Sequence, residues 1–141
     1  MSSSSLRTSE QEITNLISAY AFRNDDMDID GLGDLFSEAV FTLDGNTAHG
    51  KNEVEAFARA IIPMGLDGFA ATSHEITNLM IEVDDPAGTA TAQSYWTVYQ
   101  SVSGTPRLAV LAGRYDDHFV RRHGEWRFAK RTAVSRWKAQ L

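Results

Sequence analysis

Hydrophobic positions near the start of the chain recur with the spacing of an amphipathic helix. The stripe runs through Ile13, Leu16, Ile17, Tyr20 and Ala21. This i, i+3, i+4, i+7, i+8 pattern predicts a helix with one buried face. Thr8 or Ser9 is suited to cap its N-terminus, and Ser9 with Glu12 has the spacing of a capping box. The helix is expected to end near Asn24 or Asp25.

The rest of the chain combines two further helical patterns with long alternating stretches. Helices are predicted at 30–36 and 51–62. Strands are predicted at 39–43, 47–49, 70–83, 89–102, 107–121 and 125–137, with turns between them at Asp44-Gly45, 84–86, 104–106 and 123–124. Helices followed by an antiparallel meander indicate an α+β domain with the helices on one face of the sheet. The strands exceed the usual length, which fits a strongly curved sheet that encloses a pocket.

Composition narrows the class of protein. The chain has 141 residues, 43% hydrophobic and 23% charged, as in a globular protein. We expect residues 1–7 to form a disordered tail and 8–141 a single domain. A formal net charge of -6 argues against binding nucleic acid. The absence of cysteine excludes disulfides and a thiol nucleophile. Neither a secretory signal nor an apolar run of about 18 residues is present, so no membrane partner and a cytoplasmic location are expected.

The acidic stretch NDDMDIDGL, residues 24–32, is partly similar to a calcium-binding loop. Asp26, Asp28, Asp30 and Gly31 match the first half of an EF-hand. The twelfth position is Ser37 rather than the bidentate glutamate, so calcium binding is not predicted. Asp28 or Asp30 is expected to cap the second helix instead, and Asp26 to be solvated.

Asp25 has a different position from the other acids, because it extends the buried stripe of the first helix by one turn. Spacing alone favours a helix-end acid slightly over an acid facing a cavity. His49 and His123 belong to turns, and His118 could face either side of its strand. His74 opens a predicted strand, where a lone histidine is more often structural than catalytic. If His74 faces Asp25, however, the two would form a His–Asp general base.

Several segments together resemble a known family. They are YAFRND at 20–25, DIDGLGDLF at 28–36, SHEITNL at 73–79 and GRYDDHFVRRHGEWRFAKR at 113–131. This combination resembles the SnoaL-like branch of the nuclear-transport-factor-2-like (NTF2-like) superfamily, from about residue 8 to 138. The resemblance implies an α+β cone, with helices packed on a mostly antiparallel sheet around one deep pocket, and chemistry without a cofactor.

Within this branch the chain resembles scytalone dehydratase, bile-acid 7α-dehydratase and hexachlorocyclohexane dehydrochlorinase. These enzymes use an aspartate at the end of the first helix and a histidine at the start of a strand as an elimination base. Carried over, these roles fall on Asp25 and His74, and the catalytic tyrosine of the bile-acid enzyme falls on Tyr20. The second histidine of scytalone dehydratase falls near Tyr99, and the second aspartate of the bile-acid enzyme near Thr97. The group that assists the leaving group is therefore not inherited.

Candidates for that group and for the pocket walls lie mainly in the later strands. Proton donors could be Tyr99, Tyr95, Arg136 or Arg131, although a residue in such a position is more often a packed sheet residue. The basic residues of the C-terminal third are expected on a solvated sheet face or at the cavity mouth. Contacts with the substrate are expected from Tyr99, Trp96, Arg136, Phe69 and Met64. The apolar wall is expected to draw on Phe22, Met64, Leu66, Phe69, Trp96, Leu111 and Phe128.

These features predict a cofactor-independent and metal-free lyase that eliminates a group from a small hydrophobic cyclic or aromatic substrate. A double-bond isomerase or a polyketide cyclase could use the same pocket. A non-catalytic ligand-binding or assembly module is the other class. A homo-oligomer, dimer or trimer, is expected from the resemblance.

Overall fold

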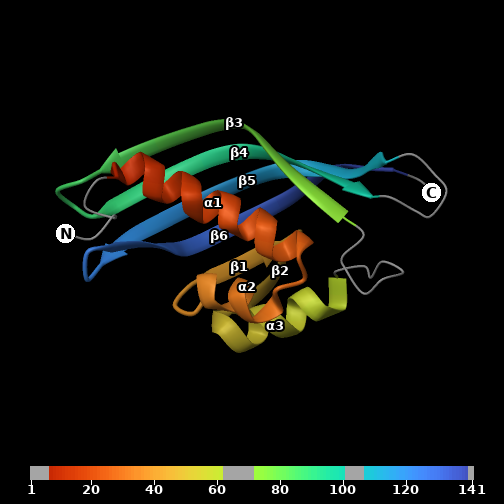
Figure 1. Ribbon diagram of the computed structural model, residues 1–141, viewed down its shortest axis with the longest axis horizontal. Helices are drawn as coiled ribbons and strands as arrows, with labels where there is room; N and C mark the ends of the chain where they lie inside the picture. The colour runs from red at the N-terminus through yellow and green to blue at the C-terminus, as the bar shows by residue number, and fades with distance from the viewer. Residues whose placement is uncertain (1–6, 62–71, 101–106, 140–141) are drawn as a thin grey trace.

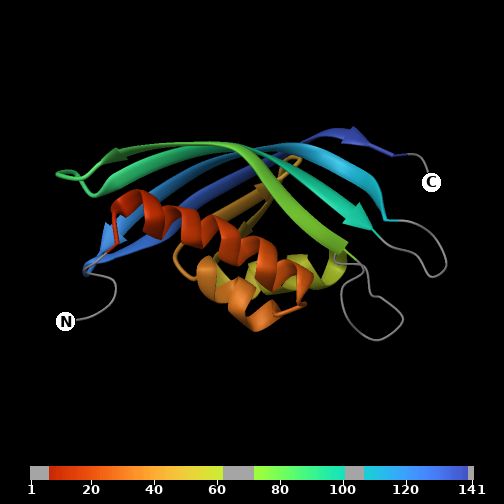
Figure 2. The same cartoon turned by 45° about the horizontal axis from the view of Figure 1, so that its top comes forward.

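The computed structural model describes residues 7–61, 72–100 and 107–139, and these form three helices and one six-stranded sheet (Figure 1). The elements are α1 (Ser9–Asp25), α2 (Ile29–Leu35), β1 (Val40–Leu43), β2 (Asn46–His49), α3 (Gly50–Ile61), β3 (Thr72–Asp84), β4 (Thr89–Gln100), β5 (Leu108–Arg122) and β6 (Glu125–Lys138). All three helices lie on the same side of the sheet, which arches over them (Figure 2). The α+β architecture predicted from the sequence is confirmed.

The sheet is mixed, with the strand order β2-β1-β6-β5-β4-β3. β3, β4, β5 and β6 form an antiparallel meander, and β1 joins β6 in parallel. The hairpin of β1 and β2 closes through Asp44 and Gly45, whose φ angles of 49° and 84° fit a turn of the I′ type. Order and pairing place β3 at one edge of the sheet and the small hairpin at the other.

Irregular pairing bends the long strands. The register shifts between Thr77 and Met80 in β3, at Val98 and Tyr99 in β4, and twice between β5 and β6. An extra residue in one strand of an antiparallel pair increases local twist and bends the strand. The strong curvature seen in Figure 2 therefore has an identifiable cause at several points along the meander.

Both ends of α1 are closed by hydrogen bonds. Thr8 is the N-cap, and its hydroxyl accepts from the backbone N–H of Gln11 at 3.1 Å while the Gln11 side chain accepts from the Thr8 N–H at 2.9 Å. The capping box is thus Thr8–Gln11, and the predicted Ser9–Glu12 box is wrong by one residue. At the other end, the Asp28 N–H donates to the Arg23 carbonyl at 2.8 Å, and Met27 has a left-handed φ of 57°. This is the Schellman arrangement, which stops the helix directly after Asp25.

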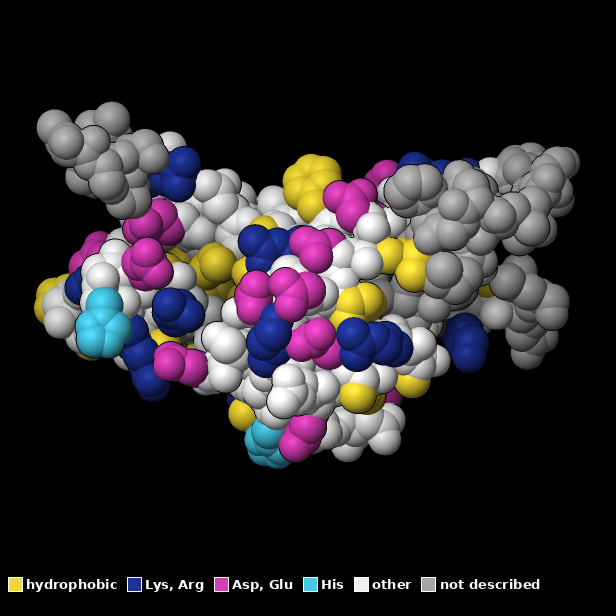
Figure 3. Space-filling view, turned by 60° about the horizontal axis from the view of Figure 1, so that its bottom comes forward, with side chains coloured by type: hydrophobic (Ala, Val, Ile, Leu, Met, Phe, Trp, Pro, Cys, Tyr) yellow, Lys and Arg dark blue, Asp and Glu magenta, His cyan; other side chains and the backbone are white. Residues whose placement is uncertain are grey.

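The acidic stretch after α1 has structural roles that differ from residue to residue. Asp28 caps α2 by accepting from the Gly31 N–H at 2.9 Å, and Asp26 is exposed. Asp30 pairs with Lys51 of α3 at 2.8 Å, and the same ammonium group reaches Asp34 at 2.7 Å. Figure 3 shows acidic and basic side chains interleaved on the face that carries α2 and α3. These acids therefore cap one helix and connect it to the next.

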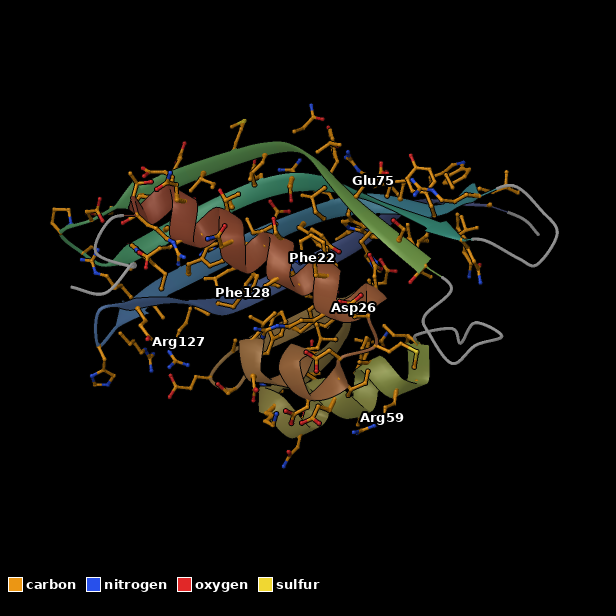
Figure 4. All side chains as sticks on the ribbon, viewed as in Figure 1. Phe22, Asp26, Arg59, Glu75, Arg127 and Phe128 are labelled. Carbon is orange, nitrogen blue, oxygen red and sulfur yellow. The ribbon has the colours of Figure 1, made fainter. Side chains whose placement is uncertain are left out.

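The core lies between the concave sheet and the helices. α1 contributes Ile13, Ile17 and Tyr20, and the sheet contributes aromatic residues, including Phe119 and Phe128. Phe128 stacks on Phe36 with ring centroids 5.0 Å apart, so it is a core residue rather than part of a cavity wall. Phe22 is 68% exposed on α1 (Figure 4), so its prediction as a wall residue is wrong. Across the described segments, no helix is both long and apolar enough to cross a membrane.

Candidate active site

A cavity of about 450 Å³ opens between the C-terminal end of α1, strand β1, the end of α3 and the concave face of the long strands. Its described walls are mainly apolar, with a small number of polar groups, which is typical of a small-molecule site. The lining residues include Tyr20, Asn24, Phe41, Leu43, Thr72, His74, Trp96, Val98, Gln100, Leu111, Tyr115 and Lys138. Of the predicted site residues, Tyr20, His74 and Trp96 belong to this wall.

Asp25 and His74 meet at the edge of the cavity, although they are 49 positions apart in the sequence. The Nδ1 atom of His74 lies 2.6 Å from Oδ1 of Asp25, and the backbone N–H of His74 donates to Oδ2 at 2.8 Å. The Thr72 hydroxyl lies 3.4 Å from Oδ1. The side chain of His74 is 11% exposed and that of Asp25 is 21% exposed, so both are largely shielded from water. The pair expected from the resemblance is therefore present in the structure.

This geometry determines which histidine nitrogen can act as a base. An ionised carboxylate accepts hydrogen bonds and donates none. With an ionised Asp25 that accepts from the His74 backbone and faces Nδ1, a neutral imidazole would carry its proton on Nδ1. The Nε2 atom then holds the free lone pair, which is the state that a general base needs. Asp25 thus orients the ring and selects its tautomer.

Tyr20 lies beside the histidine and is buried among aromatic rings. Its ring meets that of His74 edge to face, with centroids 6.4 Å apart. Burial raises the pKa of Tyr20 above its ordinary value, although the Arg131 charge and the interactions with Tyr115 and Asn24 act in the opposite direction. Tyr20 therefore keeps its proton at neutral pH and remains a hydrogen-bond donor.

Tyr115 of β5 is a second phenol at the same place, and the sequence reasoning did not identify it. Its ring packs 5.7 Å from that of Tyr20, and burial raises its pKa well above 10.0, with the nearby Tyr20 adding to the effect. Tyr115 is part of the GRYDDHF segment, and it alternates with Gly113 and Asp117 on one face of β5. That alternation is the signal that could have pointed to it.

Beneath the two tyrosines is a buried ion pair. Arg131 donates through Nε and Nη2 to the two oxygens of Asp117 at 2.8 and 3.0 Å, and both side chains are 0% exposed. The guanidinium carbon lies 3.6 Å from the centroid of Tyr115 and 4.3 Å from that of Tyr20. Burial would lower the pKa of Arg131, but the Asp117 charge raises it above its ordinary range. A fixed positive charge therefore lies against both phenol rings.

The prediction that the basic residues of the C-terminal third lie on a solvated face or at the cavity mouth is wrong for Arg131, whereas its alternative prediction as a packed sheet residue is confirmed. Trp126 and Phe128 point inward, so strict alternation would turn residue 131 outward. The register shift between β5 and β6 pairs Phe119 with Phe128 but His118 with Lys130, which leaves Ala129 as an extra residue. A slip of one residue exchanges the two faces of a strand, and Arg131 consequently points into the core.

Trp96 forms part of the cavity wall because its neighbour on β5 is a glycine. Trp96 pairs with Gly113, and its indole stacks on Tyr115 with centroids 5.6 Å apart. A methyl group at residue 113 would overlap both the indole and the Val134 carbonyl. Gly113 therefore allows the large ring to lie flat against the strand and to shape the cavity.

The other predicted contact residues lie elsewhere. Tyr99 lies between Val98 and Gln100, which both line the cavity, and it is not among the lining residues itself. The guanidinium carbon of Arg107 lies 4.2 Å from the centroid of the Tyr99 ring. Arg136 is exposed at the second register shift between β5 and β6, where it is the extra residue. Tyr95 is 43% exposed on the outer face. These positions correct the expectation that Tyr99 and Arg136 contact the substrate, and they do not support Tyr95 as a proton donor.

Three of the predicted wall residues, Met64, Leu66 and Phe69, lie outside the described residues. Leu111 lines the cavity as expected. His49, His118 and His123 are exposed. The described part of the chain contains no group of three or more histidine or acidic side chains that could hold a metal ion.

Comparison with known proteins agrees with this fold. Solved structures with the same architecture include an NTF2-like protein with a cystatin-like fold from Novosphingobium aromaticivorans, at 26% identity and a TM-score of 0.75 over 89% of this chain and 80% of that one. A hexachlorocyclohexane dehydrochlorinase, LinA type 2, is 23% identical with a TM-score of 0.78 over 94% and 88% of the two chains. A candidate scytalone dehydratase from Novosphingobium aromaticivorans is 19% identical with a TM-score of 0.75 over 100% and 92%.

These structures define the class as NTF2-like α+β cones. The SnoaL-like domain model matches residues 6–132, and the chain therefore belongs to the SnoaL-like family. No curated protein matches the chain.

Proposed function

We propose that the protein is a cofactor-independent lyase that removes a proton from carbon and expels a leaving group from a small hydrophobic cyclic or aromatic substrate. One observation carries the proposal. Both oxygens of Asp25 face donors of His74, one on the ring and one on the backbone, which leaves Nε2 as a base at the cavity wall. The similarity in fold to a dehydrochlorinase supports this class of reaction.

In the proposed step, Nε2 of His74 takes a proton from a carbon next to a carbonyl or similar activating group. The electrons of the broken C–H bond form a double bond, and negative charge develops on the activating oxygen. Collapse of that charge expels a leaving group from the adjacent carbon. The proton held by His74 passes to a departing hydroxide to form water, or to solvent when the leaving group is a halide.

Tyr20 and Tyr115 are the donors proposed to stabilise the developing oxyanion. Both remain protonated, because burial raises the pKa of each phenol. The Arg131 charge lies against their rings and strengthens them as donors without reaching the cavity itself. A positioned base contributes about 10²–10⁴-fold to a rate, and an oxyanion donor about 10²–10³-fold.

The experiment is a screen of cyclic β-hydroxy ketones in which loss of water is followed by mass spectrometry and by absorbance of the conjugated enone. For a converted compound, we expect His74→Gln to lower kcat about 10²–10⁴-fold. His49→Gln is the matched control, because the His49 side chain is exposed on β2 and it is the backbone N–H of this residue that donates to Glu53. It should leave the rate unchanged.

Asp25→Asn tests the tautomer directly. The backbone N–H and Nδ1 of His74 lie against different oxygens of Asp25, and asparagine replaces one of these oxygens by an NH2 donor. We expect the ¹⁵N spectrum of the wild-type protein to show His74 protonated on Nδ1, and the variant to lose that state together with activity. A wild-type spectrum with the proton on Nε2 would contradict the proposal.

Two alternatives give different outcomes. A polyketide cyclase that uses an acid alone would keep most of its activity in the His74→Gln variant. An isomerase would return the proton to a second carbon, so solvent deuterium would enter a product of unchanged composition. Binding of a ligand that is unaffected by Asp25→Asn, with no turnover of any compound, would indicate a non-catalytic module.

A further inference from the structure

Four residues from four adjacent strands form a row across the inner face of the sheet. His74 of β3 pairs with Val98 of β4, Val98 pairs with Leu111 of β5, and Leu111 pairs with Lys138 of β6. All four line the cavity. Because neighbouring strands are about 4.8 Å apart, the row places Lys138 on the order of 14 Å from His74 along the sheet. The proposed base and a lysine therefore lie at opposite sides of one cavity.

Lys138 differs in charge from the rest of the wall. Among the described lining residues it is the only lysine, arginine, aspartate or glutamate. It is exposed at the last residue of β6, which places it at the opening, and Gln100 lines the same cavity from the end of β4. None of the ion pairs found among the described residues involves Lys138. Within the part of the chain that the structure describes, its ammonium group therefore has no acidic partner.

The space between the two ends is apolar. Val98 and Leu111 separate His74 from Lys138 within the row, and Phe41 and Leu43 of β1 also line the cavity. An apolar middle with a base at one end and a cation at the other fits a ring compound with polar groups at its two ends. A hydrocarbon without charge would leave the ammonium group unused, and a small acid would not fill about 450 Å³.

We infer that the substrate carries an anionic group, such as a carboxylate, which Lys138 binds with Gln100 at the mouth while His74 acts on a carbon at the far end of the ring system. This inference deepens the proposed function and rests on it for the position of the reacting carbon. Lys138 would then be a specificity-determining residue that sets which end of the substrate enters first.

The test compares two probes of the same shape, 6-hydroxy-2-naphthoate and its neutral carboxamide, by calorimetry and by quenching of tryptophan fluorescence. A partly exposed ion pair contributes up to about 1 kcal/mol, so the acid should bind about fivefold more tightly than the amide. Raising the salt concentration should reduce this preference, because exposed charges are screened.

Lys138→Gln should abolish the preference and leave the affinity for the carboxamide unchanged. Lys130→Gln is the matched control, because it removes the same charge from the same strand at an exposed position outside the cavity. It should keep the preference. Equal affinities of the wild-type protein for the two probes, failure of the acid to bind, or a preference that persists in Lys138→Gln would each overturn the inference.

Binding at equilibrium needs no turnover, so the two proposals fail separately. The His74→Gln variant should keep the preference for the acid while it loses activity. If the preference depends on Lys138 but no elimination is found with any carboxylated or neutral ketone, the anion subsite stands and the proposed reaction is wrong. If elimination depends on His74 but acids bind no more tightly than amides, the proposed reaction stands and the anion subsite is wrong.

Discussion

Replacing Arg131 by methionine would leave the Asp117 carboxylate buried without a partner. The two side chains are 0% exposed and joined by two hydrogen bonds of 2.8 and 3.0 Å. The charge centres of such a pair are about 4 Å apart, which corresponds to an attraction of about 4 kcal/mol at an effective dielectric constant near 20. Loss of one partner of a buried pair costs about 3–5 kcal/mol. We expect Arg131→Met to lower the free energy of unfolding by that amount.

The double variant Arg131→Met with Asp117→Leu separates charge from packing. It removes both charges and substitutes apolar groups of comparable size, a change that is often neutral or stabilising. Most of the lost stability should therefore return. The activity should not return, because no positive charge would remain against the rings of Tyr20 and Tyr115.

The assay is urea denaturation of the wild-type protein and the variants, followed by circular dichroism and tryptophan fluorescence. Arg122→Met is the control, because the Arg122–Glu38 pair is longer, at 3.4 Å, and more than half exposed. It should change the free energy of unfolding by less than about 1 kcal/mol. A loss as small as this in Arg131→Met, or a double variant no more stable than the single one, would refute the reasoning.

Two further predictions concern the cavity wall. Burial raises the pKa of Tyr20 and Tyr115 above 10.0, so the stability from these protonated phenols is complete below about pH 10 and is lost as the pH rises further. Unfolding measured from pH 8 to 11 should show this loss. The part of the phenolate absorbance at 295 nm that is missing from a Tyr20→Phe, Tyr115→Phe double variant should appear only with unfolding, and an identical pH dependence of stability in that variant would contradict the assignment. Gly113→Ala should lower the free energy of unfolding by about 1–3 kcal/mol and shift the fluorescence of Trp96, because the added methyl group overlaps the indole. Unchanged stability and emission would show that β4 and β5 can separate at this position.

Much of the fold could be predicted from hydrophobic periodicity. The helix at Ser9–Asp25 and the strand at Glu125–Lys138 are within a few residues of the predicted ranges, because a single buried face imposes a clear period on each. Asp25 could be placed at the inward end of its helix for the same reason. Its partner required more, since no local pattern shows that residues 25 and 74 meet. Only the family resemblance connected them.

Two of the predictions that failed, those for Arg131 and Arg136, concern strand register. Arg131 and Arg136 were considered from their charge and from the acids around them, and each follows or occupies a register shift in β6. A bulge depends on pairing with the neighbouring strand, so the sequence of one strand does not reveal it. The same limitation hid Asp117, which becomes identifiable as a buried acid only when its cross-strand partner is known to be Arg131.

The bond between Asp25 and the His74 backbone has a consequence for how this protein could acquire new specificity. β3 is an edge strand, and Asp25 fastens its first residues to the end of α1. The carboxylate that contacts the proposed base therefore also holds one rim of the cavity in place, so a substitution there would change the surroundings of His74 and the shape of the cavity at once. Val98, Leu111 and Lys138 line the cavity but are not among the described residues that bond to Asp25. Selection for a different ligand can act on these three positions while the contacts between Asp25 and His74 stay intact.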